Sequence, residues 1–369
     1  MKHNRLFKRR NLLLGSAASV AIAAAHPLAR AQSAEYRWRM VSRWDETFPD
    51  QLAAAQRLAT RINTMSQGRL VIEVLPPDAV GDFSETLTAL SNGTVEMSRS
   101  LAYDWRTQSP VLEFFFVVPY GLTQPEMSAW LYYFGGQELW DEAYAPFGVK
   151  AFPVGSLGAQ SFGWFREEIN SLSDLAGLQF RTTGVAADVM AKLGVRSVSM
   201  GLSDFRPAIQ AGTLDGFEFV GPLVDLHYGV QGIVPYYYFP SYNQPSGLVE
   251  LVVNREQYET LPADLQQIIQ IAAQAEYDQG FAEANAGNAR ALQTLINDHN
   301  VQVRQLPPDV MTGLGTASGE VIAEMRSGGN NLMQRTIDSF LAARQTLMQW
   351  SQVSEQSFLS ARALPFDYG

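Results

Sequence analysis

The chain has 369 residues, contains no cysteine and carries a formal net charge of −10 at pH 7. Disulfides, thiol nucleophiles and thiolate metal sites are therefore excluded, and such an acidic chain is a poor ligand for nucleic acid or anionic membranes. The sequence also lacks a G-x-S-x-G elbow, an H-E-x-x-H pair and a phosphate-binding glycine loop. We therefore expect no nucleic-acid partner and no enzyme, although catalysis by carboxylates alone stays open.

Residues 1–31 are predicted to be a secretory signal. The segment "FKRRNLLLGSAASVAIAAAHPLARA" combines a basic start, an apolar stretch from Leu12 to Ala25 and a small-residue cleavage site ending at Ala31. Arg9 and Arg10 are similar to the pair in a twin-arginine export signal; the alternative is a Sec signal that happens to carry two arginines. We expect a periplasmic protein in either case.

The first part of the mature chain alternates strand and helix. Apolar residues recur at helical spacing in 50–65, whereas "YRWRMVS" and "GRLVIEVLPP" have the character of strands. This alternation favours a largely parallel sheet covered by helices. In chain order we predict a strand at 36–42, a helix at 50–65, a strand at 68–77, a short helix at 83–92 and a strand around Val95.

An aromatic-rich middle segment interrupts the pattern, which then resumes. A strand and turn are predicted in "GLQFRTTG", and helices in "VAADVMAKLG" and "SDFRPAIQAG", each ended by glycine. Further strands are predicted in "VRSVSM", "LDGFEFVG", 246–254 and "VQVRQL", and further helices at about 262–298, from Pro308 and from Asn331 onward.

Because the strand–helix order restarts after the middle segment, two α/β lobes are favoured over one large domain. Lobe I is predicted to comprise residues 32–155 and 246–300, and lobe II residues 156–245 and 301–330. Residues 331–369 form a separate C-terminal helix in this prediction.

Two charged residues stand at the ends of predicted strands, where ligands bind in open α/β sheets. Glu218 lies inside the apolar stretch "GFEFVGPLVD", and a buried carboxylate must be paired or must bind something. Arg181 holds the same position in "LQFRTTG", where its planar guanidinium suits a carboxylate. A helix that begins near Gly184 would add favourable amide dipoles. The alternative is that Arg181 and Glu218 pair with each other or with nearby charges.

An ordered series of segments resembles a known family. "LVIEVLPP", "FFFVVPYGL", "GAQSFGWFREEI", "SLSDLAGLQFRTTG", "AIQAGTLDGFEFVGP" and "YYYFPSYNQPSG" together resemble the solute receptors of TRAP (tripartite ATP-independent periplasmic) transporters, over essentially the whole mature chain. The similarity is closest to the branch that binds 2-oxo and 2-hydroxy monocarboxylates with a metal ion. It implies a two-lobed periplasmic solute-binding fold with crossing strands, a central cleft and long helices.

The resemblance also implies roles for individual residues. Arg181 matches the arginine that holds the ligand carboxylate, and Gln160 and Glu218 match the side chains that hold the ion, with Phe219 offering its backbone carbonyl. Hard oxygen ligands of this kind suit Na⁺ or Ca²⁺. The alternative is that Gln160 and Glu218 hydrogen-bond each other without a metal.

This chain departs from the family pattern at two points. "GAQSFGW" carries Gln160 where many members have a second arginine, so the ligands of sialic-acid and C4-dicarboxylate receptors do not transfer. Phe219 stands where the metal-dependent branch often has tryptophan.

Aromatic residues in loops are further candidates, although clustered aromatics more often form core. Tyr103 is assigned to the substrate-binding set with Arg181, Gln160 and Glu218, because family members use tyrosine in this loop. Trp44 and Tyr237 are weaker candidates, and His227 is expected on a helix surface.

The sequence is compatible with three functions. The resemblance implies a receptor that delivers a small monocarboxylate, such as pyruvate or lactate, to TRAP membrane permease subunits. The alternatives are a secreted enzyme that uses paired acids such as Asp215 and Glu218, or a ligand sensor for a signalling partner.

The C-terminal helix is expected to hold a homodimer. Its apolar residues recur at roughly helical spacing and include more large side chains than one lobe edge needs to cover. The branch resembled here is also one whose terminal helix can reach a second subunit. The residues are Ile337, Phe340, Leu341, Leu347, Met348, Trp350, Val353, Phe358 and Leu359.

Overall fold

The computed structural model describes residues 34–367, so the predicted signal segment lies outside the described residues. The first sheet has five strands in the order β2-β1-β3-β10-β4. Strands β1, β2 and β3 run parallel, as predicted, but β10 is antiparallel to both β3 and β4. The strands are β1 Tyr36–Ser42, β2 Leu70–Leu75, β3 Met97–Ser100, β4 Val149–Ser156 and β10 Leu248–Asn254.

The second sheet has six strands in the order β11-β9-β5-β8-β6-β7. Strand β5 is antiparallel to β8 and β9, and the remaining pairs are parallel. The expectation of largely parallel sheets is therefore wrong at the strands that the chain uses to pass between sheets. The strands are β5 Gly163–Phe165, β6 Gln179–Arg181, β7 Arg196–Val198, β8 Gly216–Phe217, β9 Tyr236–Phe239 and β11 Gln302–Gln305.

The helices follow the predicted order, with additional ones in the aromatic middle segment. The α-helices are α1 Pro49–Met65, α2 Thr86–Ser91, α3 Gln124–Tyr133, α4 Gly136–Tyr144, α5 Val185–Lys192, α6 Leu202–Gln210, α7 Pro222–Tyr228, α8 Arg255–Thr260, α9 Ala263–Asn297, α10 Pro308–Gly328, α11 Asn331–Val353 and α12 Glu355–Arg362. The 3₁₀ turns are η1 Phe83–Glu85, η2 Ala102–Trp105, η3 Pro110–Phe115, η4 Ala145–Phe147, η5 Leu172–Leu175 and η6 Val230–Gly232. No helix among residues 34–367 is long and apolar enough to cross a bilayer.

The chain crosses between the sheets twice in the region of the predicted site. It leaves the first sheet after β4 and enters the second at β5, and it returns from β9 to β10. The two crossings are hydrogen-bonded to each other, because the Leu157 N–H donates to the Gly247 carbonyl at 2.8 Å and the Gln160 N–H to the Gln244 carbonyl at 3.1 Å. Residue Gln160 therefore lies on a crossing segment that is fixed by backbone contacts.

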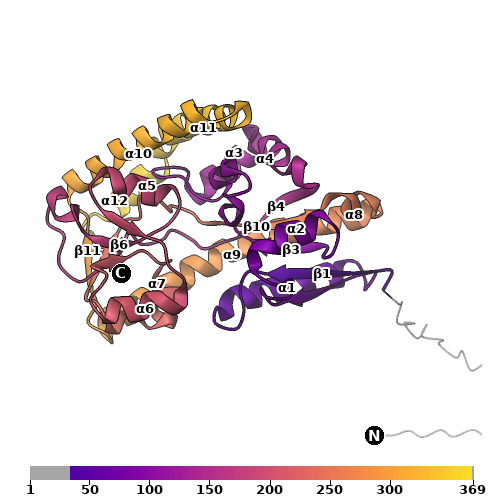
Figure 1. The fold of residues 1–369 in the computed structure, drawn as a ribbon, viewed down its shortest axis with the longest axis horizontal. Helices are drawn as coiled ribbons and strands as arrows, with labels where there is room; N and C mark the ends of the chain where they lie inside the picture. Colours follow the sequence, from indigo (N-terminus) through magenta and orange to yellow (C-terminus); the bar gives the residue numbers. More distant parts are fainter. Residues whose placement is uncertain (1–33, 368–369) are drawn as a thin grey trace, which may run out of the picture. The chain divides into compact units, whose positions relative to one another are not determined.

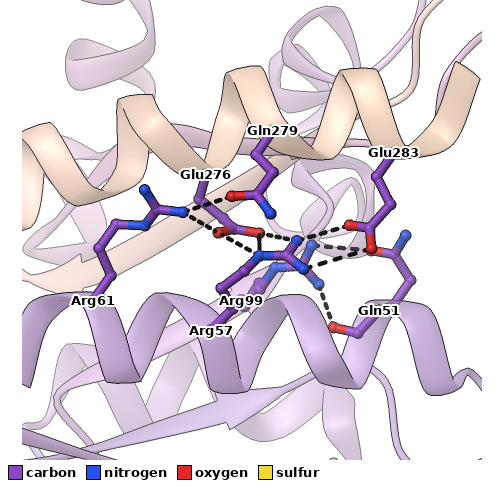
Figure 2. A network of polar contacts seen from close by, with 7 residues as sticks. All are labelled: Gln51, Arg57, Arg61, Arg99, Glu276, Gln279 and Glu283. Atoms are coloured by element: carbon purple, nitrogen blue, oxygen red, sulfur yellow. Dashed lines mark hydrogen bonds and ion pairs between the residues drawn. The ribbon is translucent and has the colours of Figure 1, made fainter. Parts of the chain in front are cut away.

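The 35-residue helix α9 packs against β4 of the first sheet, against α1 and against α7 (Figure 1). Figure 2 shows how charged side chains fasten it to α1. The carboxylate of Glu276, which is fully buried, accepts a hydrogen bond from Nε of Arg57 at 3.0 Å and lies 3.5 Å from Nη2 of Arg61. Arg57 also pairs with Glu283 at 2.7 Å. A buried carboxylate shared by two arginines fixes the long helix at one register.

The C-terminal segment is two helices rather than one, because the backbone turns at Ser354. The first half of α11 buries Ile337, Phe340 and Ala343 in the core of the first sheet. Its end and α12 bury nothing comparable, and their large apolar side chains stay exposed. These are Met348, Trp350 and Val353 in α11 and Phe358 and Leu359 in α12; Leu364 and Phe366, which follow α12, are exposed as well.

Candidate functional site

A cavity of about 160 Å³ lies between elements of the two sheets. Segments from the first sheet contribute Tyr103 of η2 and Trp44, which follows β1; the second sheet contributes Arg181, at the end of β6, and the residues that follow β8. All of the side chains that the sequence assigned to substrate or ion line this cavity: Tyr103, Gln160, Arg181, Glu218 and Phe219.

Three residues considered at the sequence level lie elsewhere. Tyr237 is fully buried and donates its hydroxyl to Asp225 at 2.8 Å, so it belongs to the core. His227 is on α7 with its side chain 55% exposed, as expected for a helix surface. The Asp215 carboxylate accepts the N–H of Gln179 at 2.7 Å and does not line the cavity. A paired-acid site of Asp215 and Glu218 is therefore not formed.

Arg181 is held by the backbone of the neighbouring strand and has no carboxylate partner among the ion pairs of the described residues. Its Nη1 donates to the Glu218 carbonyl at 2.6 Å, and its buried Nε has no hydrogen-bond acceptor. The cation is therefore fixed in direction while part of its donor capacity is unused. An arginine in this state is prepared for an anion.

The Glu218 carboxylate is almost completely buried, with 4% of the residue exposed. Its pKa is raised to about 7. Burial is the main cause and the charge of Asp225 adds to it, whereas the charge of Arg181 and a hydrogen bond from Thr182 lower the pKa. Its Oε1 has no hydrogen-bond partner. Unpaired buried carboxylate oxygens are rare in folded proteins and need a partner such as an ion.

Gln160 also has buried polar atoms without hydrogen-bond partners. It is 2% exposed, and neither its Oε1 nor its Nε2 has a hydrogen-bond partner. Gln160 and Glu218 therefore do not hydrogen-bond each other, which argues against the alternative of a metal-free pair. An amide oxygen and a carboxylate oxygen that line one cavity are ligand types that fit a hard cation.

No group of three or more His, Cys, Asp or Glu side chains that could hold a metal occurs in the part of the chain that the structure describes. An ion here would have to use amide and backbone oxygens besides Glu218. Phe219 follows Glu218 directly and lines the cavity, and its ring packs against Phe205 and Tyr228.

Tyr103 faces this group of residues from the first sheet. Burial raises the pKa of its hydroxyl, and the charges of Arg43, Arg181 and Glu218 are all close enough to affect it. The hydroxyl accepts a hydrogen bond from Nη2 of Arg43 at 3.2 Å. Its own proton is therefore free to point at a ligand.

The sequence analysis missed two charged residues of the cavity wall, Arg43 and Glu113. Arg43 directly follows β1, so the rule that ligands bind beyond strand ends could have found it. Glu113 lies in η3, and burial raises its pKa while the charge of Arg106 and the N–H of Val185 at the start of α5 lower it. Nothing local in the sequence marks it.

The family model of bacterial extracellular solute-binding proteins, family 7 (DctP), matches residues 40–328. The chain belongs to this family. It is a TRAP solute-binding receptor with the two-lobed fold of that family, as the sequence predicted. Family members and relatives are binding proteins rather than enzymes, and family membership supports a periplasmic location.

Relatives of this DctP-family receptor have known ligands. A monocarboxylate 2-oxoacid-binding periplasmic protein of Nostoc is 31% identical over 325 residues, which are 87% of this chain and 88% of the relative. A TRAP solute-binding protein of Pseudoalteromonas atlantica with bound sodium and pyruvate is 32% identical, with a TM-score of 0.82 over 89% of this chain and 99% of that one.

Two further structures show related ligands. A TRAP solute-binding protein of Colwellia psychrerythraea, with bound calcium and pyruvate, is 32% identical, with a TM-score of 0.82 over 88% of this chain and 99% of that one. One from Bordetella bronchiseptica, a dimer with calcium and picolinate, is 28% identical, with a TM-score of 0.83 over 90% and 100%.

Proposed function

We propose that this receptor binds a small 2-oxo or 2-hydroxy monocarboxylate, such as pyruvate or lactate, together with one Na⁺ or Ca²⁺ ion, and delivers it to a TRAP membrane permease. One observation carries the proposal: the buried Oε1 atoms of Gln160 and Glu218 lack hydrogen-bond partners in the wall of the same cavity as Arg181, whose Nε is also unused. Relatives that are 32% identical contain sodium or calcium with pyruvate.

In this proposal the cation is held by Oε1 of Gln160, the carboxylate of Glu218 and the carbonyl of Phe219. When bound, it supplies positive charge for the ligand's carboxylate and its 2-oxo or 2-hydroxy oxygen. Arg181 holds the carboxylate from the other side, and the hydroxyl of Tyr103 donates to the ligand from lobe I. The bound cation and acid would give partners to the unpaired Oε1 atoms of Gln160 and Glu218 and would hold the charges away from water.

The proposed route of export to the periplasm rests on the N-terminal segment. The basic and apolar pattern of residues 1–31 supports export by a twin-arginine signal.

The proposal keeps the lobe boundaries predicted from the sequence. It also includes a homodimer, which is supported by the exposed apolar side chains of α12 and of the end of α11 and by the dimer of the Bordetella relative.

Calorimetry with chemically matched acids tests the ligand. Pyruvate and lactate carry an oxygen on C2, whereas propionate does not, so pyruvate and lactate should bind and propionate should bind far more weakly. Each acid is titrated in Na⁺, in Ca²⁺ and in choline buffer with a chelator, with a thermal shift as the second readout. The proposal fails if no 2-oxo or 2-hydroxy acid produces heat or stabilisation with either cation.

A further inference from the structure

The arginines at the cavity differ in what neutralises them. Nη1 of Arg43 lies 3.1 Å from Oδ1 of Asp104, and Nη1 of Arg106 lies 3.5 Å from Oε1 of Glu113. Arg181 has no such partner in the described part of the chain. The charge of Arg181 is therefore available to a ligand, whereas that of Arg43 is already balanced.

Arg43 is nonetheless part of the same cavity. It lines the wall together with Arg181 and Glu218, and its side chain is 28% exposed. Tyr103 connects the two regions, since its hydroxyl accepts from Arg43 while the charges of Arg181 and Glu218 affect its pKa. Because Arg181, Tyr103 and Arg43 line one cavity, a ligand held by Arg181 can extend past Tyr103 toward Arg43.

The guanidinium of Arg43 is also held independently of Asp104. It lies 5.7 Å from the ring centre of Tyr103 and 5.9 Å from those of Trp44 and Phe83. Cation–π contacts at these distances keep the charge in place. Removal of the Asp104 carboxylate would therefore expose a positioned cation rather than release a flexible side chain.

Asp104 itself does not line the cavity. Its side chain is 9% exposed, and its Oδ2 accepts the N–H of Leu101 at 3.1 Å. Any effect of Asp104 on a ligand must pass through the charge and direction of Arg43. Asp104 is therefore a positioning and neutralising residue, not a contact residue.

From these contacts we infer that Asp104 restricts the pocket to acids with a single carboxylate, by neutralising the arginine that a second carboxylate would reach. This inference rests on the proposed function and defines its ligand class. A second carboxylate beside Arg43 would lose its hydration and meet no net positive charge, and rejection through an unpaired buried charge is an effective form of specificity. With Asp104 neutral, Arg43 would become a second carboxylate site.

The test uses two acids of equal length. 2-Oxopentanoate and 2-oxoglutarate differ only in the terminal group, a methyl in one and a carboxylate in the other. Calorimetry in Na⁺ and in Ca²⁺ buffer should show that the natural protein binds 2-oxopentanoate and discriminates against 2-oxoglutarate. Asp104→Asn should tighten 2-oxoglutarate binding by roughly tenfold or more, with a smaller change for 2-oxopentanoate.

Two control variants separate this effect from other causes. The double variant Asp104→Asn with Arg43→Gln should lose the gain, because the exposed cation is then absent. Glu142→Gln changes the net charge equally at a surface pair with Arg335, and it should give no gain. Asp104→Ser repeats the test if Asp104→Asn does not fold, as judged by circular dichroism.

The outcomes are distinguishable. Equal affinity of the natural protein for both acids overturns the inference, as does a folded Asp104 variant that binds 2-oxopentanoate without any gain for 2-oxoglutarate; both leave the proposed function intact. A natural protein that binds neither a 2-oxo nor a 2-hydroxy acid with either cation overturns the inference and the proposed function together.

Discussion

Arg181 and Glu218 are joined in both directions through the backbone: the Glu218 N–H donates to the Arg181 carbonyl at 2.9 Å, and Nη1 of Arg181 donates to the Glu218 carbonyl at 2.6 Å. The arginine therefore fixes the main chain of Glu218 and leaves the carboxylate free of a salt bridge. Arg181 ends β6 and Glu218 directly follows the adjacent strand β8, yet the two opposite charges do not form a salt bridge. This arrangement keeps one side chain for an anion and the other for a cation.

Replacement of Arg181 by alanine should abolish micromolar binding of the acid while the fold persists. Loss of a charge-assisted contact of this kind costs roughly 2–5 kcal/mol, or about 30-fold to several thousand-fold in affinity. Calorimetry measures the change, with Arg304→Ala as the control, because Arg304 is a surface arginine paired with Glu168. An unchanged dissociation constant in Arg181→Ala would show that the carboxylate is held elsewhere.

Glu218→Gln should separate stability from binding. The ion-free protein should become more stable at about pH 8, on the order of 1–3 kcal/mol, because an unpaired buried charge is removed. The same change should abolish the stabilisation that Na⁺ or Ca²⁺ gives to the natural protein, since the charged oxygens are lost. Thermal unfolding with and without cation measures both effects.

A sample of the natural protein that is shown to be metal-free by elemental analysis supplies the second half of this test. It should bind the acid weakly and recover when the cation is restored. Binding at full strength without metal would contradict the ion site and leave an acid-only pocket.

Glu250 should make the fold less stable as the pH rises. Its carboxylate is fully buried in the first sheet and accepts from the hydroxyls of Ser100 and Tyr144 and from Nε1 of Trp105. Burial raises its pKa from 4.5 to about 7. Between pH 4.5 and about 7 the folded state holds a proton on Glu250 that the unfolded chain has released. The free energy of unfolding therefore falls as the pH rises through this range, by about 3 kcal/mol at most, and it levels off at higher pH.

The corresponding variant is Glu250→Gln, which keeps the size and removes the titration. Urea unfolding at about pH 5, 6, 7 and 8 should show a smaller decline for Glu250→Gln than for the natural protein. Parallel curves for the two proteins would mean that Glu250 does not supply this pH dependence. Glu218 and Asp225 also have raised pKa values, so the difference between the two curves, rather than either curve alone, is the measured quantity.

The C-terminal segment should mediate dimerisation. Trp350 is 66% exposed and Phe358 65% exposed, and such large apolar side chains mark an interaction surface. Deletion from Gln345 onward should give monomers or aggregates, and the double change Trp350→Ser with Phe358→Ser should give soluble monomers. Light scattering of the intact mature chain should report about twice the monomer mass; a clean monomer at tens of micromolar would contradict the dimer.

Much of the architecture could be predicted because its signals are periodic and long. Helices α1 and α9 and strands β1 and β2 begin and end within a few residues of the predicted positions. Strands β4, β5 and β9 were not predicted. Strands β5 and β9 have three and four residues, too few for an informative alternation, and β4 is buried along almost its whole length, so its sequence does not alternate. The strand around 216–220 is shorter than predicted, because β8 ends at Phe217 and Glu218 lies just beyond it.

Glu218 was predicted as a buried carboxylate from its apolar surroundings, but the other buried acids could not be predicted. Asp225 lies in the first turn of α7, where an acid is usually exposed, yet it is fully buried and accepts from Nε1 of Trp164 at 2.8 Å. Trp164 is 61 residues away from Asp225 in the sequence. The position of Arg43 directly after β1 could have marked it as a candidate, but its pairing with Asp104, a residue of another loop, could not be predicted. Pairings between distant loops leave no local pattern in a single sequence.

The backbone around Gln160 has a consequence for the order of events during binding. The N–H of Gln160 is bonded to Gln244, and that of Ser161 to the Val220 carbonyl at 3.1 Å. These bonds tie the backbone at Gln160 to the segment after β8 that carries Glu218, so these two proposed ion ligands are held together independently of Tyr103. If they bind the cation as proposed, the cation enters first and creates the charge that attracts the acid, and Tyr103 arrives last. Cation concentration would then set the rate at which the receptor is loaded.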